Sequence, residues 1–127
     1  METSVNNFRR VLIAEDEAVT RRMMERVVRS LGAEHVELVE NGAEALRRAT
    51  YHHFDLVLMD LIMPVMDGYD ATRELRRRGY LRPIVAVTAS VIEDAVVRCA
   101  EAGCDSCIPK PVSAERLKLS LSNITRH

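Results

Sequence analysis

The feature that most constrains the fold is a pattern that occurs five times, a short apolar run followed by an amphipathic segment. The runs lie at residues 11–14, 36–39, 56–59, 84–87 and, more weakly, 106–108. The first, third and fourth are continuously apolar, as is typical of strands covered on both faces, whereas the second alternates with acidic residues and is expected at a sheet edge. This alternation of strands and helices predicts an α/β doubly wound, five-stranded parallel sheet with helices on both faces.

The segments between the runs carry their apolar residues at helical spacing. Asn41 and Ser113 are placed as N-caps of the second and fifth helices, and Ser90 with Glu93 predicts a capping box that opens the fourth. The predicted inward stripes are Val19, Met23, Met24, Val27, Val28 and Leu31 in the first helix, Gly42, Ala45, Leu46 and Ala49 in the second, Tyr69, Thr72, Leu75 and Arg76 in the third, Ile92, Val96, Val97 and Ala100 in the fourth, and Leu117, Leu121 and Ile124 in the fifth.

Length and composition limit the classes of protein that fit. The 127 residues suit a single domain over 1–127, with a loose N-terminal segment at 1–8. A formal net charge of -1 argues against a strongly basic nucleic-acid binder. No apolar run approaches the roughly 20 residues of a membrane helix, and the N-terminus lacks the apolar centre of a secretory signal. Three cysteines, an odd number, disfavour a disulfide scaffold, so we expect a cytoplasmic location.

Polar side chains follow the predicted strands where the strands end. Residues 15–17 are all acidic, Asp60 ends the third run, Thr88 ends the fourth, and Lys110 follows the fifth. Because sites in such sheets lie outside the carboxyl ends of the strands, we expect these groups to meet. Crowded carboxylates must take up protons, pair with Lys110 or bind a cation, and Mg²⁺ prefers such oxygen ligands. The set predicts phosphoryl transfer onto an aspartate.

Five pieces of the chain occur in a characteristic order, namely Glu15-Asp16, Asp60, Met63-Pro64-Val65-Met66-Asp67-Gly68, Thr88-Ala89-Ser90 and Lys110-Pro111. Together they resemble the receiver domains of bacterial two-component response regulators, over nearly the whole chain. The stretch at 63–68, followed by residues 71–73, is most similar to receivers of hybrid sensor kinases or to stand-alone relatives. The resemblance implies a flavodoxin-like strand order 2-1-3-4-5, a (βα)5 architecture, and a phosphoprotein of two-component phosphorelay signalling.

The resemblance also implies roles for individual residues. Asp60 is the phosphoacceptor and takes its phosphoryl group from a phosphohistidine on a histidine kinase or a histidine phosphotransfer protein. Asp16 and Asp60 bind Mg²⁺ directly, Glu15 binds it through water, and the backbone carbonyl of Ile62 completes the metal ligands.

Two further residues act on the phosphoryl group by the same resemblance. Lys110, with a cis bond to Pro111, contacts a phosphoryl oxygen, and Thr88 hydrogen-bonds the group and reports its presence. Such a domain promotes its own Mg²⁺-dependent phosphorylation and dephosphorylation but turns over no outside substrate, so it is not an enzyme in that sense. It changes conformation to control a downstream protein, with no direct contact to nucleic acid or membrane.

Three positions depart from the usual pattern or modify it. Glu15 stands where most receivers have aspartate. Cys107 occupies a switch position where many receivers have Tyr or Phe, so we expect output to depend on the loop after Thr88 and on the fourth helix, with no ring rotation. The apolar Ile62 cannot orient an attacking water, which predicts slow self-dephosphorylation.

Other interpretations of the same residues remain open. The chain could be a receiver-like protein-interaction module that is never phosphorylated, its acidic site a relic. A hydrolase with an aspartyl-phosphate intermediate would need a second aspartate where Ile62 stands. Cys99, Cys104 and Cys107 have the spacing of plant-type ferredoxin ligands, but a cluster needs a fourth thiolate and the chain has three cysteines, so small buried side chains are expected.

Overall fold

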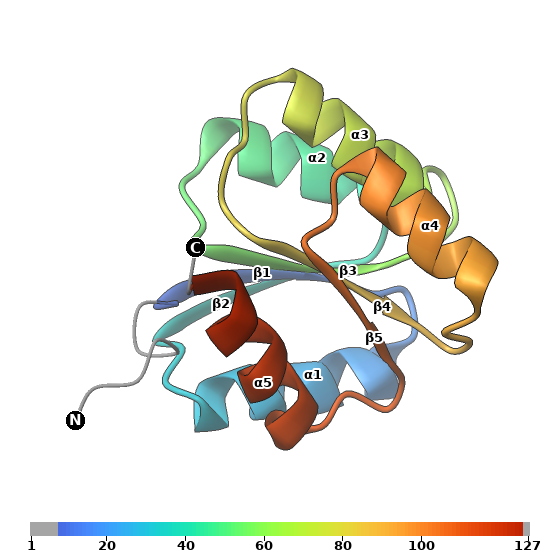
Figure 1. Cartoon of the computed structure of the whole chain (residues 1–127). Helices are drawn as coiled ribbons and strands as arrows, with labels where there is room; N and C mark the ends of the chain where they lie inside the picture. Colours follow the sequence, from blue (N-terminus) through green and yellow to red (C-terminus); the bar gives the residue numbers. More distant parts are fainter. Residues whose placement is uncertain (1–7, 126–127) are drawn as a thin grey trace.

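A computed structural model describes residues 8–125 as a five-stranded sheet with helices on both faces (Figure 1). All neighbouring strands are parallel and their order is β2-β1-β3-β4-β5, so the predicted fold class and strand order are confirmed, with β2 at an edge. The strands are β1 (Arg10–Ala14), β2 (His35–Val39), β3 (Leu56–Asp60), β4 (Ile84–Thr88) and β5 (Ser106–Pro109). The helices are α1 (Ala18–Ser30), α2 (Gly42–Tyr51), α3 (Gly68–Arg77), α4 (Glu93–Ala102) and α5 (Ala114–Thr125).

The two faces of the sheet carry separate apolar cores because successive side chains of a strand point to opposite faces. Figure 1 shows α1 and α5 on one face and α2, α3 and α4 on the other. Val11 and Ile13 of β1 pack in the core under α1 and α5, whereas Leu12 and Ala14 pack under α2 and α3. The central strands β1, β3 and β4 are buried on both sides, as their continuous apolar runs predict.

Three helices match their sequence patterns closely. In α2, α3 and α5 the predicted inward residues are buried or partly buried. Asn41 caps α2 by accepting a hydrogen bond from the Glu44 backbone N–H at 2.9 Å. Ser113 accepts one from the Arg116 backbone N–H at 3.1 Å, so both predicted caps are confirmed.

The N-terminal segment begins to pack earlier than expected. Phe8 is 5% exposed and belongs to the core under α1 and α5, so the loose segment predicted for 1–8 does not extend to its last residue. Burial of its large aromatic ring favours packing against the core, although the neighbouring residues in the sequence are polar. Residues 1–7 lie outside the described part of the chain.

The buried face of α1 is narrower than the apolar stripe that the sequence predicts for this helix. Met24 and Val28 are buried, but Val19 and Met23 are exposed, so the prediction is wrong for these two. Met23 lines an open cavity of about 280 Å³ beside Lys110 instead of the core.

The prediction for α4 is wrong in its orientation. Ile92, Val96, Val97 and Ala100 were expected to face the core, yet all four are exposed. The buried residues of α4 are Cys99 and Ala102, whose small side chains allow the helix to approach its neighbours closely.

The start of α4 also differs from the expected capping box. Its N-cap is Ile92, which makes no side-chain capping bond. The Ser90 backbone N–H donates to Thr88 Oγ1 at 3.3 Å, so Ser90 belongs to the loop after β4.

In the described residues, no helix is both long enough and apolar enough to span a bilayer.

Candidate functional site

Three carboxylates meet where the sheet's central strands end. Glu15 and Asp16 follow β1, and Asp60 is the last residue of the neighbouring β3. One carboxylate oxygen from each lies within 4.8 Å of the other two. Parallel strands end at the same edge, and the sequence prediction that these side chains converge is therefore matched by the geometry.

A single ammonium group lies among these carboxylates. Lys110 Nζ is 2.8 Å from Glu15 Oε1 and 3.2 Å from Asp60 Oδ2. Its backbone N–H donates to the carbonyl of Thr88 at 2.8 Å, and the bond to Pro111 is cis, as expected. Burial alone would lower the pKa of Lys110, but Glu15 and Asp60 outweigh it and raise the pKa, so the side chain is charged.

Asp60 is poorly compensated for its burial. Asp60 is only 3% exposed. This burial, together with the nearby Glu15 carboxylate, raises the pKa of Asp60 to about 6. Lys110 and the Ile62 backbone N–H, 3.4 Å from Oδ1, oppose this rise only in part. At neutral pH the site therefore carries more negative charge than its one ammonium neutralises.

The donor set fits a hard divalent cation such as Mg²⁺. All three carboxylates offer oxygen, and Asp16 is exposed and opens the cluster to solvent. Glu15 is fully buried, and within the described residues its Oε1 accepts no hydrogen bond of favourable geometry despite the ion pair with Lys110. Glu15 shares this one ammonium partner with Asp60, so a divalent cation in the cluster would compensate the remaining negative charge.

The loop after Asp60 holds the phosphoacceptor candidate in place, and the residues that do so are Asp67 and Gly68. A Cβ on Gly68 would collide with the backbone carbonyl oxygen of Asp60, so only glycine permits this approach of α3 to β3. The Gly68 N–H donates to the Leu61 carbonyl at 2.9 Å. Asp67 caps α3 by accepting from the Asp70 N–H at 2.9 Å. The Asp67-Gly68 pair was the sequence signal for this close contact.

Of the remaining predicted residues, Thr88 and Ile62 lie near the carboxylate cluster and Cys107 does not. Thr88 is 7% exposed, and its Oγ1 donates to the Ser90 carbonyl at 3.3 Å. The Ile62 side chain is 70% exposed. Cys107 is not at the cluster, because it pairs with Ala86 in the sheet and packs in the small core beside α4. Glu17, the third acidic residue after β1, caps α1 by accepting from the Thr20 N–H at 2.7 Å.

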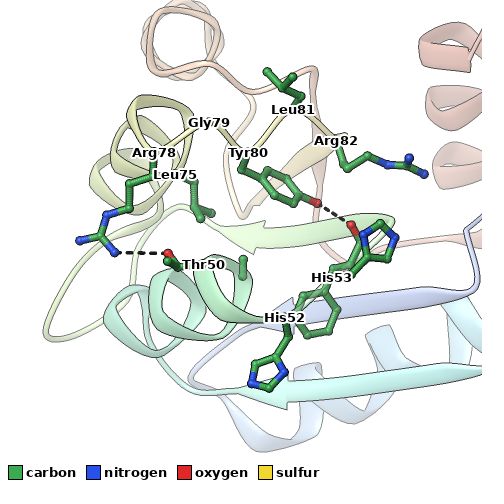
Figure 2. A pocket seen from close by; sticks show the side chains of 11 residues that line it. Thr50, His52, His53, Leu75, Arg78, Gly79, Tyr80, Leu81 and Arg82 are labelled. Atoms are coloured by element: carbon green, nitrogen blue, oxygen red, sulfur yellow. Dashed lines mark hydrogen bonds between the residues drawn. The ribbon is translucent and has the colours of Figure 1, made fainter.

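A second hollow, of about 290 Å³, lies at the C-terminal ends of α2 and α3 (Figure 2). His52 and His53 line it, and the Tyr80 hydroxyl donates to the carbonyl of Phe54 at 3.2 Å. His53 Nε2 is 2.9 Å from Asp55 Oδ1. Among the described residues, the one group of three or more side chains spaced to hold a metal is Glu15, Asp16 and Asp60, which does not include these histidines.

Comparison with known proteins decides the family. Residues 11–122 match the family described as response regulator receiver domain. The chain belongs to this family. The receiver is 40% identical over 116 residues to the two-component response regulator ORR41 of Oryza sativa subsp. japonica, covering 89% of this chain and 91% of that protein.

Receivers of sensor kinases are similar as well. The sensor histidine kinase RcsC of Escherichia coli strain K12 is 35% identical over 119 residues, which is 94% of this chain but only 12% of the kinase. The receiver domain of the sensor histidine kinase PA1611 from Pseudomonas aeruginosa has a TM-score of 0.81 and 36% identity, with 91% of this chain and 96% of that chain covered. That structure has a magnesium ion coordinated in its active site cleft. The chain is therefore a signalling receiver domain and not a classical enzyme.

Proposed function

We propose that this receiver accepts a phosphoryl group on Asp60 from a phosphohistidine of a histidine kinase or a histidine phosphotransfer protein. The observation that carries the proposal is the cluster itself. A buried aspartate at the end of β3 faces two further carboxylates and one ammonium at the edge of the sheet. A structural carboxylate would be surrounded by donors, whereas this one is crowded by acceptors.

In the transfer, an Asp60 carboxylate oxygen forms a bond to phosphorus while the bond from phosphorus to the imidazole nitrogen breaks. The imidazole takes the electron pair of the broken bond. Lys110, already 3.2 Å from Asp60 Oδ2, neutralises charge on a phosphoryl oxygen. Because Asp60 has a pKa of about 6, it is mostly ionised at neutral pH and can act as the nucleophile.

The residues suited to hold Mg²⁺ are Asp16 and Asp60 directly, Glu15 through water, and the backbone carbonyl of Ile62. When bound, Mg²⁺ offsets the negative charge of the carboxylates and of the incoming phosphoryl group. The magnesium in the cleft of the PA1611 receiver supports this assignment, since the two chains are 36% identical.

The phosphoryl group then changes the conformation of a downstream-binding surface. Thr88 ends β4 and accepts a backbone hydrogen bond from Lys110, and its hydroxyl donates to the carbonyl of Ser90 in the loop that follows. A phosphoryl oxygen on Asp60 offers Thr88 a charged acceptor in place of the Ser90 carbonyl, which would release the loop that leads into α4. Cys107 has no ring to rotate, so this loop and α4 carry the output.

Mass spectrometry of the purified chain with Mg²⁺ and acetyl phosphate tests the proposal. We expect a stable mass gain of one phosphoryl group, abolished in Asp60→Ala and retained in Asp55→Ala, which changes an aspartate at the other end of the same strand. No gain in the folded wild type would favour an interaction module that is never phosphorylated. Continuous phosphate release would instead favour a hydrolase.

A further inference from the structure

The end of α4 brings two cysteines together by its backbone geometry. Gly103 has a φ of 113°, and its N–H donates to the Ala100 carbonyl at 3.1 Å. The Cys104 N–H donates to the Cys99 carbonyl at 3.0 Å. These two bonds make up a left-handed helix ending that frequently brings the side chains at its two outer positions into contact. In this chain those two positions are Cys99 and Cys104.

The packing around the two thiols agrees with this backbone arrangement. Cys99 is 2% exposed, and Cys104 and Cys107 pack against the same small core beside α4. The side chains of Cys99 and Cys104 interact, which raises the pKa of Cys99 and lowers that of Cys104. The backbone ending makes Cys99 and Cys104 neighbours beside the same small core, so the arrangement suits chemistry between these two thiols.

The surroundings of Cys104 favour its thiolate form. Its side chain is partly accessible, and its Sγ lies 3.8 Å from Thr72 Oγ1. Its interaction with Cys99 lowers the pKa of Cys104, and the Thr72 hydroxyl and the Arg76 guanidinium act in the same direction. Together they outweigh burial and the Asp105 carboxylate, which would raise it. Arg76 is held there by a hydrogen bond from its Nε to the Gly103 carbonyl at 2.9 Å. Reactive cysteines occur in such positively charged, partly exposed surroundings.

We propose that Cys104 and Cys99 form a peroxide-responsive thiol pair, in which Cys104 reacts first and Cys99 resolves it to a disulfide. The Cys104 thiolate attacks the terminal oxygen of a hydroperoxide, forming an S–O bond and breaking the O–O bond. The leaving hydroxide or alkoxide takes a proton from solvent and departs as water or an alcohol, and Cys104 becomes a sulfenic acid. The Cys99 sulfur then attacks the sulfenic sulfur. An S–S bond forms, the S–O bond breaks, and the departing oxygen leaves as water with the Cys99 proton.

The disulfide would link the last turn of α4 to the short segment that connects α4 to β5. It would replace a non-covalent contact with a covalent bond at the end of the helix proposed to carry the output. Cys107 lies within β5, three residues beyond Cys104, and is not needed for this link. The site is separate from the carboxylate cluster, so its oxidation can be measured whether or not Asp60 is phosphorylated.

Peptide mapping of the native chain after treatment with hydrogen peroxide tests the proposal. Free thiols are first blocked, and the chain is then cut after glutamate and before aspartate. Glu101 separates Cys99 from Cys104, and Asp105 separates Cys104 from Cys107, so each possible pairing gives a different linked peptide. We expect the Cys99–Cys104 link in the wild type and in Cys107→Ser, reversed by dithiothreitol.

Two further variants identify the order of events. Cys104→Ser should lose peroxide-sensitive thiols at least about tenfold more slowly than wild type, because the activated thiol is gone. Cys99→Ser should accumulate a sulfenic acid on Cys104, trapped as a dimedone adduct. A predominant link to Cys107, unchanged oxidation in Cys104→Ser, or oxidation only after unfolding by urea would each overturn the proposal.

Discussion

The two ends of β3 each carry an aspartate, and the two side chains are in opposite situations. Asp55 immediately precedes the strand, and its Oδ2 accepts hydrogen bonds from the backbone N–H groups of Arg9 at 3.0 Å and Arg10 at 2.9 Å. Its Oδ1 lies 2.9 Å from His53 Nε2 and 3.2 Å from an Arg82 nitrogen. Asp60 ends the strand among other carboxylates.

These surroundings shift the pKa values of the two aspartates in opposite directions. Burial would raise the pKa of Asp55, but the Arg10 N–H, His53 and Arg82 outweigh it and lower the pKa. Burial and Glu15 raise the pKa of Asp60 to about 6. The same residue type on one strand is thus a structural group where donors saturate it. It is a reactive or ion-binding group where acceptors crowd it.

Neutralising each aspartate should change stability in opposite directions. In chelator at neutral pH, we expect Asp60→Asn to raise the free energy of unfolding by on the order of 1–3 kcal/mol, because a buried charge crowded by Glu15 is removed. Asp55→Asn should lower it by about 1–3 kcal/mol, because two backbone donors and Arg82 lose a charged acceptor. Urea unfolding followed by circular dichroism measures both, and changes of the same sign would contradict the comparison.

The pH dependence sharpens the same contrast. Folded Asp60 holds its proton to about pH 6 against an ordinary value of 3.8, so between these values the folded chain binds more protons. Stability from this group therefore falls as pH rises from 3.8 to 6 and stays low above.

Accordingly, the gain from Asp60→Asn should be full at neutral pH and vanish near about pH 4. Asp55 behaves oppositely, since its lowered pKa contributes stability that is present at neutral pH and lost in acid. Repeating the metal-free urea unfolding across this range checks both curves. A gain from Asp60→Asn that grows toward low pH would refute the electrostatic account.

Removing the cationic partner should change the pKa of Asp60 more than that of Asp55. With Mg²⁺ removed, Lys110→Met should raise the pKa of Asp60 further, by roughly 1–2, because Lys110 is its only ammonium partner among the described residues. Arg82→Met should raise the pKa of Asp55 less, since its backbone donors and His53 remain. Carboxyl carbon chemical shifts followed by NMR titration give both values, and an equal effect at the two ends would be contrary to expectation.

The smallest effect concerns the lifetime of the phosphorylated form. Ile62→Asn should speed loss of the phosphoryl group by about three- to tenfold, the value of one hydrogen bond to the attacking water. Val65→Asn is the matched control, an exposed apolar residue in the same loop. Its φ of 69° suits asparagine. Phosphoryl content followed by mass spectrometry after donor removal measures the rates, and equal rates for both variants would remove Ile62 from this role.

The site was predictable from the sequence because of one rule. Parallel strands end at the same edge, so Glu15, Asp16 and Asp60 had to converge once the apolar runs were read as a parallel sheet. The pairing of Lys110 with both Glu15 and Asp60 was less predictable, because the Lys110 side chain must reach from the end of β5 past β4 to the ends of β3 and β1.

The orientation of α4 was not predictable from hydrophobic periodicity. That signal selects the stripe with the largest apolar side chains, including Val96 and Val97, whereas the packing buries the smaller Cys99 and Ala102. The Arg98 guanidinium covers the Tyr69 ring at 4.0 Å, a long-range contact that no local pattern contains. Asp55 likewise carries no motif, since its donors come from segments far apart in the chain.

The most direct test of the account is a calorimetric titration of Mg²⁺ into the metal-free chain at neutral pH. The account predicts one site in the wild type and in Asp55→Asn, weakened at least about tenfold in Asp60→Asn and in Asp16→Asn. No magnesium uptake by the wild type, or equal affinity in Asp60→Asn, would contradict the claim that this end of the sheet is built around a shared cation.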